Sequence, residues 1–251
     1  MIAIGTAGWS VPKAYAEAFP PLGSHLARYA GRFDAVEINT SFYRSHRRAT
    51  YERWAATVPE HFRFAVKVLR TITHERRLRD AEALLEGFLG EVAGLGPKLG
   101  PLLLQLPPSL RFDDPTSPAF LRAFRAAFAG DIACEPRHAS WFEPAVDGLL
   151  ADLRIARVAA DPAPVPGAGE PGGWREWRYD RLHGSPTIYY SAYGPRRLDV
   201  IADRLAADAA RGRRGWCIFD NTAAFAATGD ALSTLERLRS PAPPDHTGGP
   251  G

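Results

Sequence analysis

Charged and polar side chains stand at the ends of apolar runs in this sequence, and their types are suited to proton transfer and anion binding. Glu37, Lys67, Glu135 and His183 each close or follow such a run. A carboxylate and an imidazole can act as general base and general acid, and a buried ammonium can bind phosphate or take part in proton transfer. We therefore predict these four as the catalytic residues.

These side chains need elements that bring them to one place. Strand-length apolar runs recur at intervals of about thirty residues, and segments between them, such as residues 84–92 and 120–128, have helical periodicity. The runs cover residues 2–5, 34–39, 62–68, 102–106, 131–135, 156–160, 181–184 and 216–221. Strand alternating with helix predicts an α/β fold, a single (β/α)8 TIM-type barrel with parallel strands. A doubly wound open sheet is the alternative architecture.

Alternation along each strand indicates which side chains face the barrel interior. It groups Glu37 with Asn39, Glu135 with Arg137, and Arg181 with His183, but does not decide between Asp220 and Asn221. Active sites of such barrels lie at the carboxyl ends of the strands. The predicted substrate-binding residues, which lie at or beyond these ends, are Thr6, Trp9, Asn39, Tyr43, His74, Gln105, Arg137, Trp141, Tyr193, Asp220 and Asn221.

The expected ligand is small and anionic. Lys67, Arg137 and His74 would hold it, and arginines within residues 44–48 and 70–77 add a basic flank suited to phosphate. We expect hydrolysis or isomerisation of a sugar phosphate or nucleotide. One alternative is a nucleic-acid binding or repair protein that uses the basic flank. The other is a non-catalytic partner protein whose buried charges neutralise one another.

A divalent metal is a further alternative. The side chains that could coordinate it are Glu37, Glu135, Asp161, His183 and Asp220. The sequence has no His-Glu-X-X-His motif, and Lys67 and Arg137 would repel a nearby dication. We therefore predict no metal ligand and assign no cofactor.

The composition is typical of one globular domain, with 45% hydrophobic and 24% charged residues. A net charge of +3 does not by itself indicate a nucleic-acid partner. We predict the barrel domain over residues 1–239 and a disordered Pro/Gly-rich tail over residues 240–251. Residues 162–173 are rich in Pro and Gly and predict a long loop, either a lid or a flexible insertion.

Cysteine usage and hydropathy bear on the location of the protein. Cys134 and Cys217 lie within predicted strands, where buried free thiols are expected. The sequence shows neither a leader segment nor an apolar run long enough to cross a bilayer. We expect a cytoplasmic protein without membrane contact.

Seven motifs, taken in order, resemble those of the YecE-like proteins, known as domain of unknown function family 72. They are GTAGWS (5–10), VEINTSFYR (36–44), FRFAVKVLRTITH (62–74), KLGPLLLQLPPSLRF (98–112), CEPRHASWF (134–142), YDRLHG (179–184) and FDNTAAFAATGDA (219–231). The resemblance implies a β/α barrel, similar in shape to barrels of the endonuclease IV and xylose isomerase type, and most of the predicted site residues match its signature positions. Val11 and Tyr15 depart from the Tyr and Trp that family members commonly carry.

Overall fold

The computed structural model describes residues 2–113 and 115–239, so the predicted tail over residues 240–251 lies outside the described part. The strands are β1 (Ile2–Thr6), β2 (Ala35–Ile38), β3 (Arg63–Lys67), β4 (Leu99–Gln105), β5 (Ile132–Glu135), β6 (Ile155–Arg157), β7 (Ala159–Asp161), β8 (Gly172–Gly173), β9 (Trp177–Leu182) and β10 (Arg214–Phe219). The α-helices are α1 (His25–Ala30), α2 (Arg48–Thr57), α3 (Glu82–Val92), α4 (Thr116–Ala127), α5 (Pro144–Asp152), α6 (Pro195–Ala210) and α7 (Ala226–Arg239).

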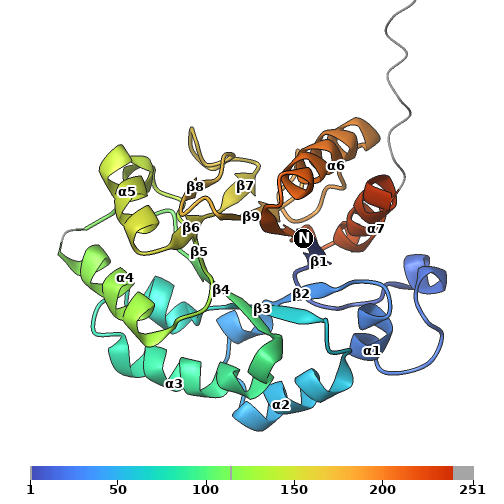
Figure 1. Ribbon diagram of the computed structural model, residues 1–251, viewed down its shortest axis with the longest axis horizontal. Helices are drawn as coiled ribbons and strands as arrows, with labels where there is room; N and C mark the ends of the chain where they lie inside the picture. Colours follow the sequence, from blue (N-terminus) through green and yellow to red (C-terminus); the bar gives the residue numbers. More distant parts are fainter. Residues whose placement is uncertain (1, 114, 240–251) are drawn as a thin grey trace, which may run out of the picture.

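The strands pair into two sheets, and the helices lie around the outside of the strands (Figure 1). One sheet has the order β1-β10-β9-β7, and the other has the order β2-β3-β4-β5-β6-β8. All strand pairs among the described residues are parallel except the short β6–β8 pair. The predicted α/β class with parallel strands is confirmed, whereas a single closed barrel is not, because the strands pair as two sheets.

The two sheets fill the space between them with side chains of different size. One buried cluster combines alanines of the six-stranded sheet with aromatic residues of the four-stranded sheet: Ala35, Ala65, Ala133, Ala156, Trp177, Tyr179 and Trp216. The Tyr179 and Trp216 rings stack with centroids 6.2 Å apart. Small residues opposite large ones give the dense packing that a protein interior requires. Ala35, Ala65 and Ala133 point between the sheets, so the predicted alternation of inward-facing and helix-facing residues holds along β2, β3 and β5.

The other face of the strands packs against the helices. Val36 and Val66 belong to a second buried cluster that includes Leu85 and Phe88 of α3. On α4, Phe120, Leu121 and Phe124 are buried, as their helical spacing predicts. Because side chains alternate along a strand, the residues between these helix-facing positions point into the space between the sheets.

The strand predicted at residues 181–184 begins earlier than the sequence indicated, at Trp177. Arg178 and Asp180 made this segment look polar, yet both are buried on its helix-facing side. Arg178 Nε lies 2.6 Å from Asp180 Oδ2, and its Nη1 lies 3.3 Å from Oδ2 of Asp208 on α6. Ion pairing takes the place of apolar contact here, and a hydrophobicity pattern does not detect it.

The run predicted as one strand at residues 156–160 is divided between the sheets. β6 pairs with β5, β7 pairs with β9, and Val158 lies between them. The predicted loop at 162–173 also ends in a strand, since β8 pairs with β6. Arg157 fixes the intervening segment, donating from Nη1 to the carbonyl oxygens of Gly167 and Glu170.

Two further expectations concern thiols and membrane contact. Cys134 and Cys217 are free and buried, as predicted. Within the described ranges, no helix combines the length and apolar character that a membrane span requires.

Candidate functional site

Ionisable side chains from both sheets meet at the carboxyl ends of the strands. They form what we call the carboxyl-end cluster, which consists of Glu37, Lys67, Glu135, Arg181, His183 and Asp220. Each is at most 6% exposed. Three of the four predicted catalytic residues, Glu37, Glu135 and His183, are joined through this network. Lys67 lies beside it.

Arg181 is the centre of the cluster. Its Nη2 and Nε donate to Glu37 at 2.8 and 3.0 Å, its Nη1 donates to Glu135 at 2.6 Å, and its Nη2 also donates to Asp220 at 2.9 Å. Glu37 accepts a further bond from the Tyr179 hydroxyl at 2.8 Å. Arg181 was not among the predicted site residues, although alternation with His183 placed it on the inward face.

His183 bridges two carboxylates. Its Nδ1 lies 3.0 Å from Asp220 Oδ2, and its Nε2 lies 3.1 Å from Glu135 Oε1. Burial opposes the charged imidazole, but the charge of Glu135 and the hydrogen bonds to both carboxylates outweigh it and raise the pKa of His183. The imidazolium form lets both ring nitrogens donate, so His183 is a candidate general acid.

The carboxylates respond in the opposite direction. Burial raises the pKa of Glu135, but Arg181, His183 and Arg137 outweigh it and hold that pKa well below the ordinary value. Asp220 follows the same pattern, with Arg181 as the largest opposing charge, and its pKa is lowered. Both carboxylates are therefore ionised and act as acceptors at neutral pH.

Lys67 differs from the rest of the cluster because its ammonium has no hydrogen bond or ion pair with any described residue. Its Nζ lies 4.1 Å from the centroid of the Phe42 ring. Burial and the nearby charge of Arg181 lower the pKa of Lys67 to about 8, against the opposing effect of Glu37 and the other carboxylates. A buried cation without a bound anion is a candidate anion site.

Short helical turns after β2 and β3 build the surroundings of Lys67. A 3₁₀ turn, Thr40–Phe42, presents Phe42, and a π-helical turn, Thr71–Glu75, presents His74. The His74 and Phe42 rings meet edge to face at 4.9 Å. Burial, followed by the charges of Lys67, Arg70 and Arg137, lowers the pKa of His74 to about 4. His74 is therefore neutral beside a group of cations.

Arg137 and Tyr189 close the opposite side of the cluster. Arg137 Nη2 lies 2.9 Å from Glu135 Oε1, and both of its terminal nitrogens lie 3.3 Å from the Tyr189 hydroxyl. The Tyr189 ring lies edge-on to His183 at 5.6 Å. Tyr189 adopts a φ of 71°, a conformation that side-chain-bearing residues rarely adopt and that is common near functional sites. No sequence pattern indicated Tyr189.

Alternation left Asp220 and Asn221 undecided, and the structure separates them. Asp220 joins Arg181 and His183, whereas Asn221 Nδ2 donates to Ser191 O at 2.9 Å and to Asp230 Oδ2 at 2.7 Å, outside the cluster. Asp220 is therefore the residue that faces the site.

Four other predicted binding residues make local hydrogen bonds. Thr6 bonds to Gly8 O and to the Tyr29 hydroxyl. Gln105 bonds to Leu106 O, and Trp141 bonds to Leu110 O. Tyr193 bonds to Gly184 N and to Asp161 O. All four are at most 6% exposed. Their bonds secure the loops that follow the strands.

A cavity of about 540 Å³ lies at the ends of β1 and β2. Trp9, Asn39 and Tyr43, three of the predicted binding residues, line it. A smaller cavity of about 70 Å³ is lined by Glu135, Arg137 and His183. Of these two cavities, the smaller one is therefore the one that cluster residues line.

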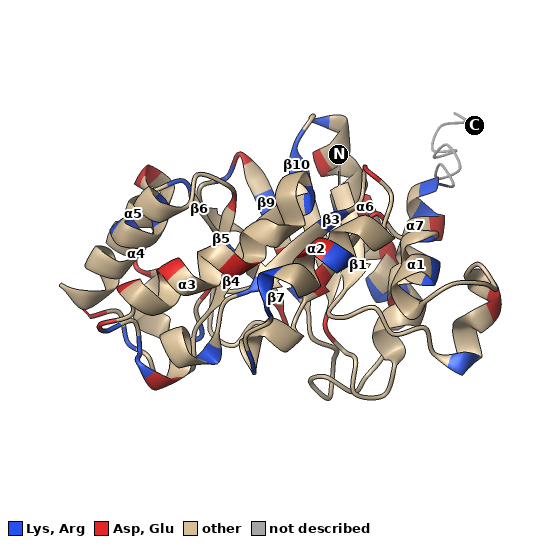
Figure 2. Cartoon of the chain, turned by 90° about the horizontal axis from the view of Figure 1, so that it is seen from below, with Lys and Arg blue, Asp and Glu red and all other residues tan. Residues whose placement is uncertain are grey.

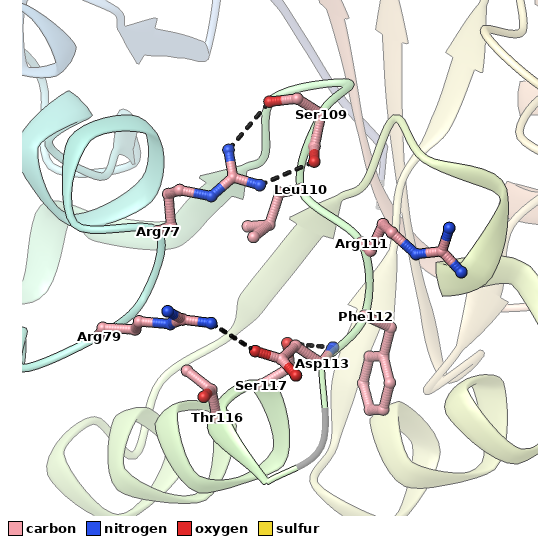
Figure 3. A pocket seen from close by; sticks show the side chains of 9 residues that line it. All are labelled: Arg77, Arg79, Ser109, Leu110, Arg111, Phe112, Asp113, Thr116 and Ser117. Atoms are coloured by element: carbon pink, nitrogen blue, oxygen red, sulfur yellow. Dashed lines mark hydrogen bonds and ion pairs between the residues drawn. The ribbon is translucent and has the colours of Figure 1, made fainter.

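Another cavity, of about 270 Å³, lies between the loops that follow β3 and β4 (Figure 3). Arg77 donates to the hydroxyl and carbonyl oxygens of Ser109, and Arg79 pairs with Asp113 at 2.8 Å. Figure 3 shows Arg111 pointing away from these two arginines. The guanidinium groups join one loop to the other, so this basic hollow is a structural contact.

No group of three or more potential metal ligands is arranged to hold an ion within the described ranges. Glu135 and Asp220 instead accept hydrogen bonds from Arg181 and His183. Charges elsewhere are mixed, and Figure 2 shows basic and acidic residues interspersed along the chain. The site is thus a compact ionic network.

Comparison with known proteins identifies relatives over most of the chain. The sequence model of a family described as "Protein of unknown function DUF72" matches residues 3–248. UPF0759 protein YecE of Escherichia coli K12 is 33% identical over 174 residues, which cover 66% of this chain and 61% of that protein. UPF0759 protein YunF of Bacillus subtilis 168 is 33% identical over 156 residues, 57% of this chain and 53% of that protein. The matched part therefore spans less than two thirds of either relative.

Solved structures match the whole fold. A DUF72 family protein from Enterococcus faecalis V583 has a TM-score of 0.80 and 21% identity, with 97% of each chain covered. A DUF72 family protein from Thermotoga maritima MSB8 has a TM-score of 0.76 and 21% identity, covering 96% of this chain and all of that one. At this identity, the likeness extends to the fold.

Proposed function

The chain belongs to the DUF72 family of proteins of unknown function, and from the geometry of its carboxyl-end cluster we propose that it is an enzyme that binds and converts a small anionic ligand there. The leading class is hydrolysis or isomerisation of a phosphorylated compound. The buried ammonium of Lys67 carries this proposal.

Lys67 is 6% exposed and has no anionic group in contact among the described side chains. Burying a cation is costly unless an anion compensates it. Neutral His74 with Arg70 and Arg137 nearby extends the positive surroundings, as their effect on the pKa of His74 indicates. A phosphate or carboxylate group of the ligand would supply the missing anion and accept hydrogen bonds from Lys67.

Proton transfer is assigned to His183 and Glu135, which line a common cavity. His183 has a raised pKa and can donate a proton to a leaving or carbonyl oxygen, after which it takes up a proton from water. Ionised Glu135 accepts a hydrogen bond from His183 and favours its return to the imidazolium form. Glu37 accepts three hydrogen bonds from Arg181 and Tyr179 and lines none of the cavities described above. Its assigned part is to position Arg181.

The proposal includes an eight-stranded closed barrel, in which the two sheets meet at two seams. At one seam, Ala7 and Glu37 form a parallel bridge, and Gly8 N donates to Glu37 O at 2.9 Å. At the other, β6 and β7 are consecutive, with Val158 N donating to Cys134 O at 2.9 Å. A closed barrel would surround the cluster with strands on all sides.

Calorimetric titration tests the anion site. Inorganic phosphate, sugar phosphates and nucleotides are titrated into wild type, Lys67→Met and, as a matched control, Lys13→Met, which replaces an exposed lysine. We expect at least one phosphate compound to bind wild type and Lys13→Met, and to lose about tenfold or more in affinity for Lys67→Met. Equal affinity for all three proteins would overturn the proposal.

Nucleic acid is a second candidate because exposed aromatic side chains lie on loops beyond the strand ends. Tyr43, Tyr190 and Phe225 are 72, 60 and 56% exposed. Such rings can stack on unpaired bases beside basic residues. Under this alternative, oligonucleotides bind with an affinity that falls steeply with salt, while free phosphate compounds bind poorly.

A further inference from the structure

We propose that the ligand is a nucleotide, whose base occupies the cavity between Trp9 and Tyr43 while its phosphate lies at Lys67. This inference rests on the proposed function. The proposed function places the anionic group of the ligand at Lys67, and the inference adds where the uncharged part of the same ligand binds. Three independent features of the cavity support it.

The first feature is the size and the lining of the cavity. Its volume is about 540 Å³, within the range of small-molecule sites. The polar and aromatic side chains that line it are Trp9, Ser10, His25, Asn39, Thr40, Tyr43 and Thr222. Among the described residues, no Asp, Glu, Lys or Arg lines this cavity. Walls without a carboxylate, ammonium or guanidinium group suit a heterocycle that carries hydrogen-bonding groups but no charge.

The second feature is the side-chain amide of Asn39. It makes no hydrogen bond within the described part of the chain, and its Oδ1 atom is buried without a partner. Buried polar atoms in folded proteins are nearly always satisfied, so an unsatisfied one at a cavity indicates a missing partner. An amide offers a donor and an acceptor together, which match the paired donor and acceptor on the edge of a base.

The third feature is the arrangement of the two aromatic residues. Trp9 is braced edge to face by Trp54 at 5.0 Å, and Tyr43 is held in the same way by Phe42 at 5.0 Å. Although held, Tyr43 remains 72% exposed. A rigid aromatic ring that stays accessible is suited to stacking on a flat heterocycle.

One turn of the chain connects this cavity with Lys67. Asn39 directly precedes the Thr40–Phe42 turn, and Phe42 contacts both Tyr43 and the Lys67 ammonium. The Ser41 hydroxyl lies 2.9 Å from Ile38 O and 2.7 Å from Lys67 O, and its one hydrogen is shared between these acceptors, which fixes the turn to the ends of β2 and β3. A ligand with a ring joined to a phosphate can therefore use both parts of the site at once.

The test compares ligands that contain the base, the phosphate or both. AMP, GMP, CMP and UMP are titrated alongside ribose 5-phosphate, inorganic phosphate and adenosine. We expect at least one nucleoside monophosphate to bind about tenfold more tightly than ribose 5-phosphate. Tyr43→Ala and Asn39→Ala should each remove most of this difference. The control Tyr190→Ala replaces another exposed tyrosine, which does not line this cavity, and should leave the difference intact.

The outcomes separate this inference from the proposed function. If phosphate compounds bind through Lys67 but the base adds no affinity, or if sugar phosphates bind more tightly than every nucleotide, the base site is overturned and the anion site stands. If adenosine binds through Tyr43 and the phosphate adds nothing, the base site stands and the anion site is overturned. If none of the ligands binds, both are overturned. Because the Asn39 amide has no partner, Asn39→Ala should unfold at the wild-type temperature or above, so its binding loss would not arise from unfolding.

Discussion

Arg181 donates two hydrogen bonds to Glu37, at 2.8 and 3.0 Å, although the two residues are 144 positions apart in the chain. Glu37 lies on β2 of one sheet and Arg181 on β9 of the other. Both side chains are fully buried. This ion pair therefore links the two sheets at the level of the candidate site, and its removal affects both stability and the shape of the cluster.

Replacing Arg181 with Met should be strongly destabilising. The variant leaves Glu37, Glu135 and Asp220 without their shared cation, and unpaired buried charges cost about 3–5 kcal/mol. Urea unfolding measures the change. Arg48→Met, which breaks an exposed pair with Glu52, is the control and should cost less than about 1 kcal/mol. A similar small loss for both variants would contradict a central structural part for Arg181.

Gly5→Ala should separate β1 from β2. A Cβ atom at Gly5 would lie 2.2 Å from the carbonyl oxygen of Ala35, a backbone atom that cannot move aside without shifting β2. We expect a loss of about 3 kcal/mol or more in unfolding free energy. Gly87→Ala, at an exposed position of α3 where a Cβ meets nothing within 4 Å, should instead stabilise by about 1 kcal/mol. Equal effects of the two changes would refute the close approach.

The pKa values of the two histidines of the site should be shifted in opposite directions from that of an ordinary imidazole, downward for His74 and upward for His183. Burial and nearby cations lower the pKa of His74 to about 4, while Glu135 and the carboxylate hydrogen bonds outweigh burial and raise that of His183. His183 therefore contributes stability below about pH 6.5, which is lost as the pH rises through its folded pKa. His74 removes stability as the pH falls from about 6.5 toward its folded pKa.

NMR titration of the imidazole carbon-bound protons checks both shifts. Because Lys67 is the largest charge acting on His74, Lys67→Met should raise the pKa of His74. An unchanged His74 titration in this variant would show that the two side chains do not interact.

Lys67 should make the protein more stable at alkaline pH. Its pKa of about 8 in the folded chain lies below the ordinary value of 10.5, so between these values the unfolded chain binds more protons. The contribution of Lys67 to the unfolding free energy therefore rises with pH in this window, by about 2 kcal/mol between pH 8 and pH 10, while the buried thiols of Cys134 and Cys217, whose pKa values burial raises, act in the opposite direction in all variants. Lys67→Met should lack this rise and Lys13→Met should retain it, as measured by urea unfolding at both pH values. The same slope in all three proteins would contradict the lowered pKa.

The local pattern of the sequence predicted the α/β class and many of the inward-facing residues. Alternation has a fixed period of two along a strand, so it correctly grouped Ala35 with Glu37 and Arg181 with His183. The sequence pattern did not predict the first part of β9, because Arg178 and Asp180 look polar although they are buried. Both are paired with charged residues of α6. The catalytic roles of Glu135, His183 and Lys67 stay predictions.

What the sequence by itself determined was which face of a strand each residue occupies and which residue types reach the strand ends, because both depend on local backbone geometry. Only the tertiary structure decided that Arg181 joins three carboxylates, that Asp220 rather than Asn221 faces the cluster, and that no described carboxylate forms an ion pair with Lys67. Those relationships depend on contacts between strands far apart in the chain. Such contacts are set by register and by the packing of the two sheets, which a periodicity of a few residues does not contain.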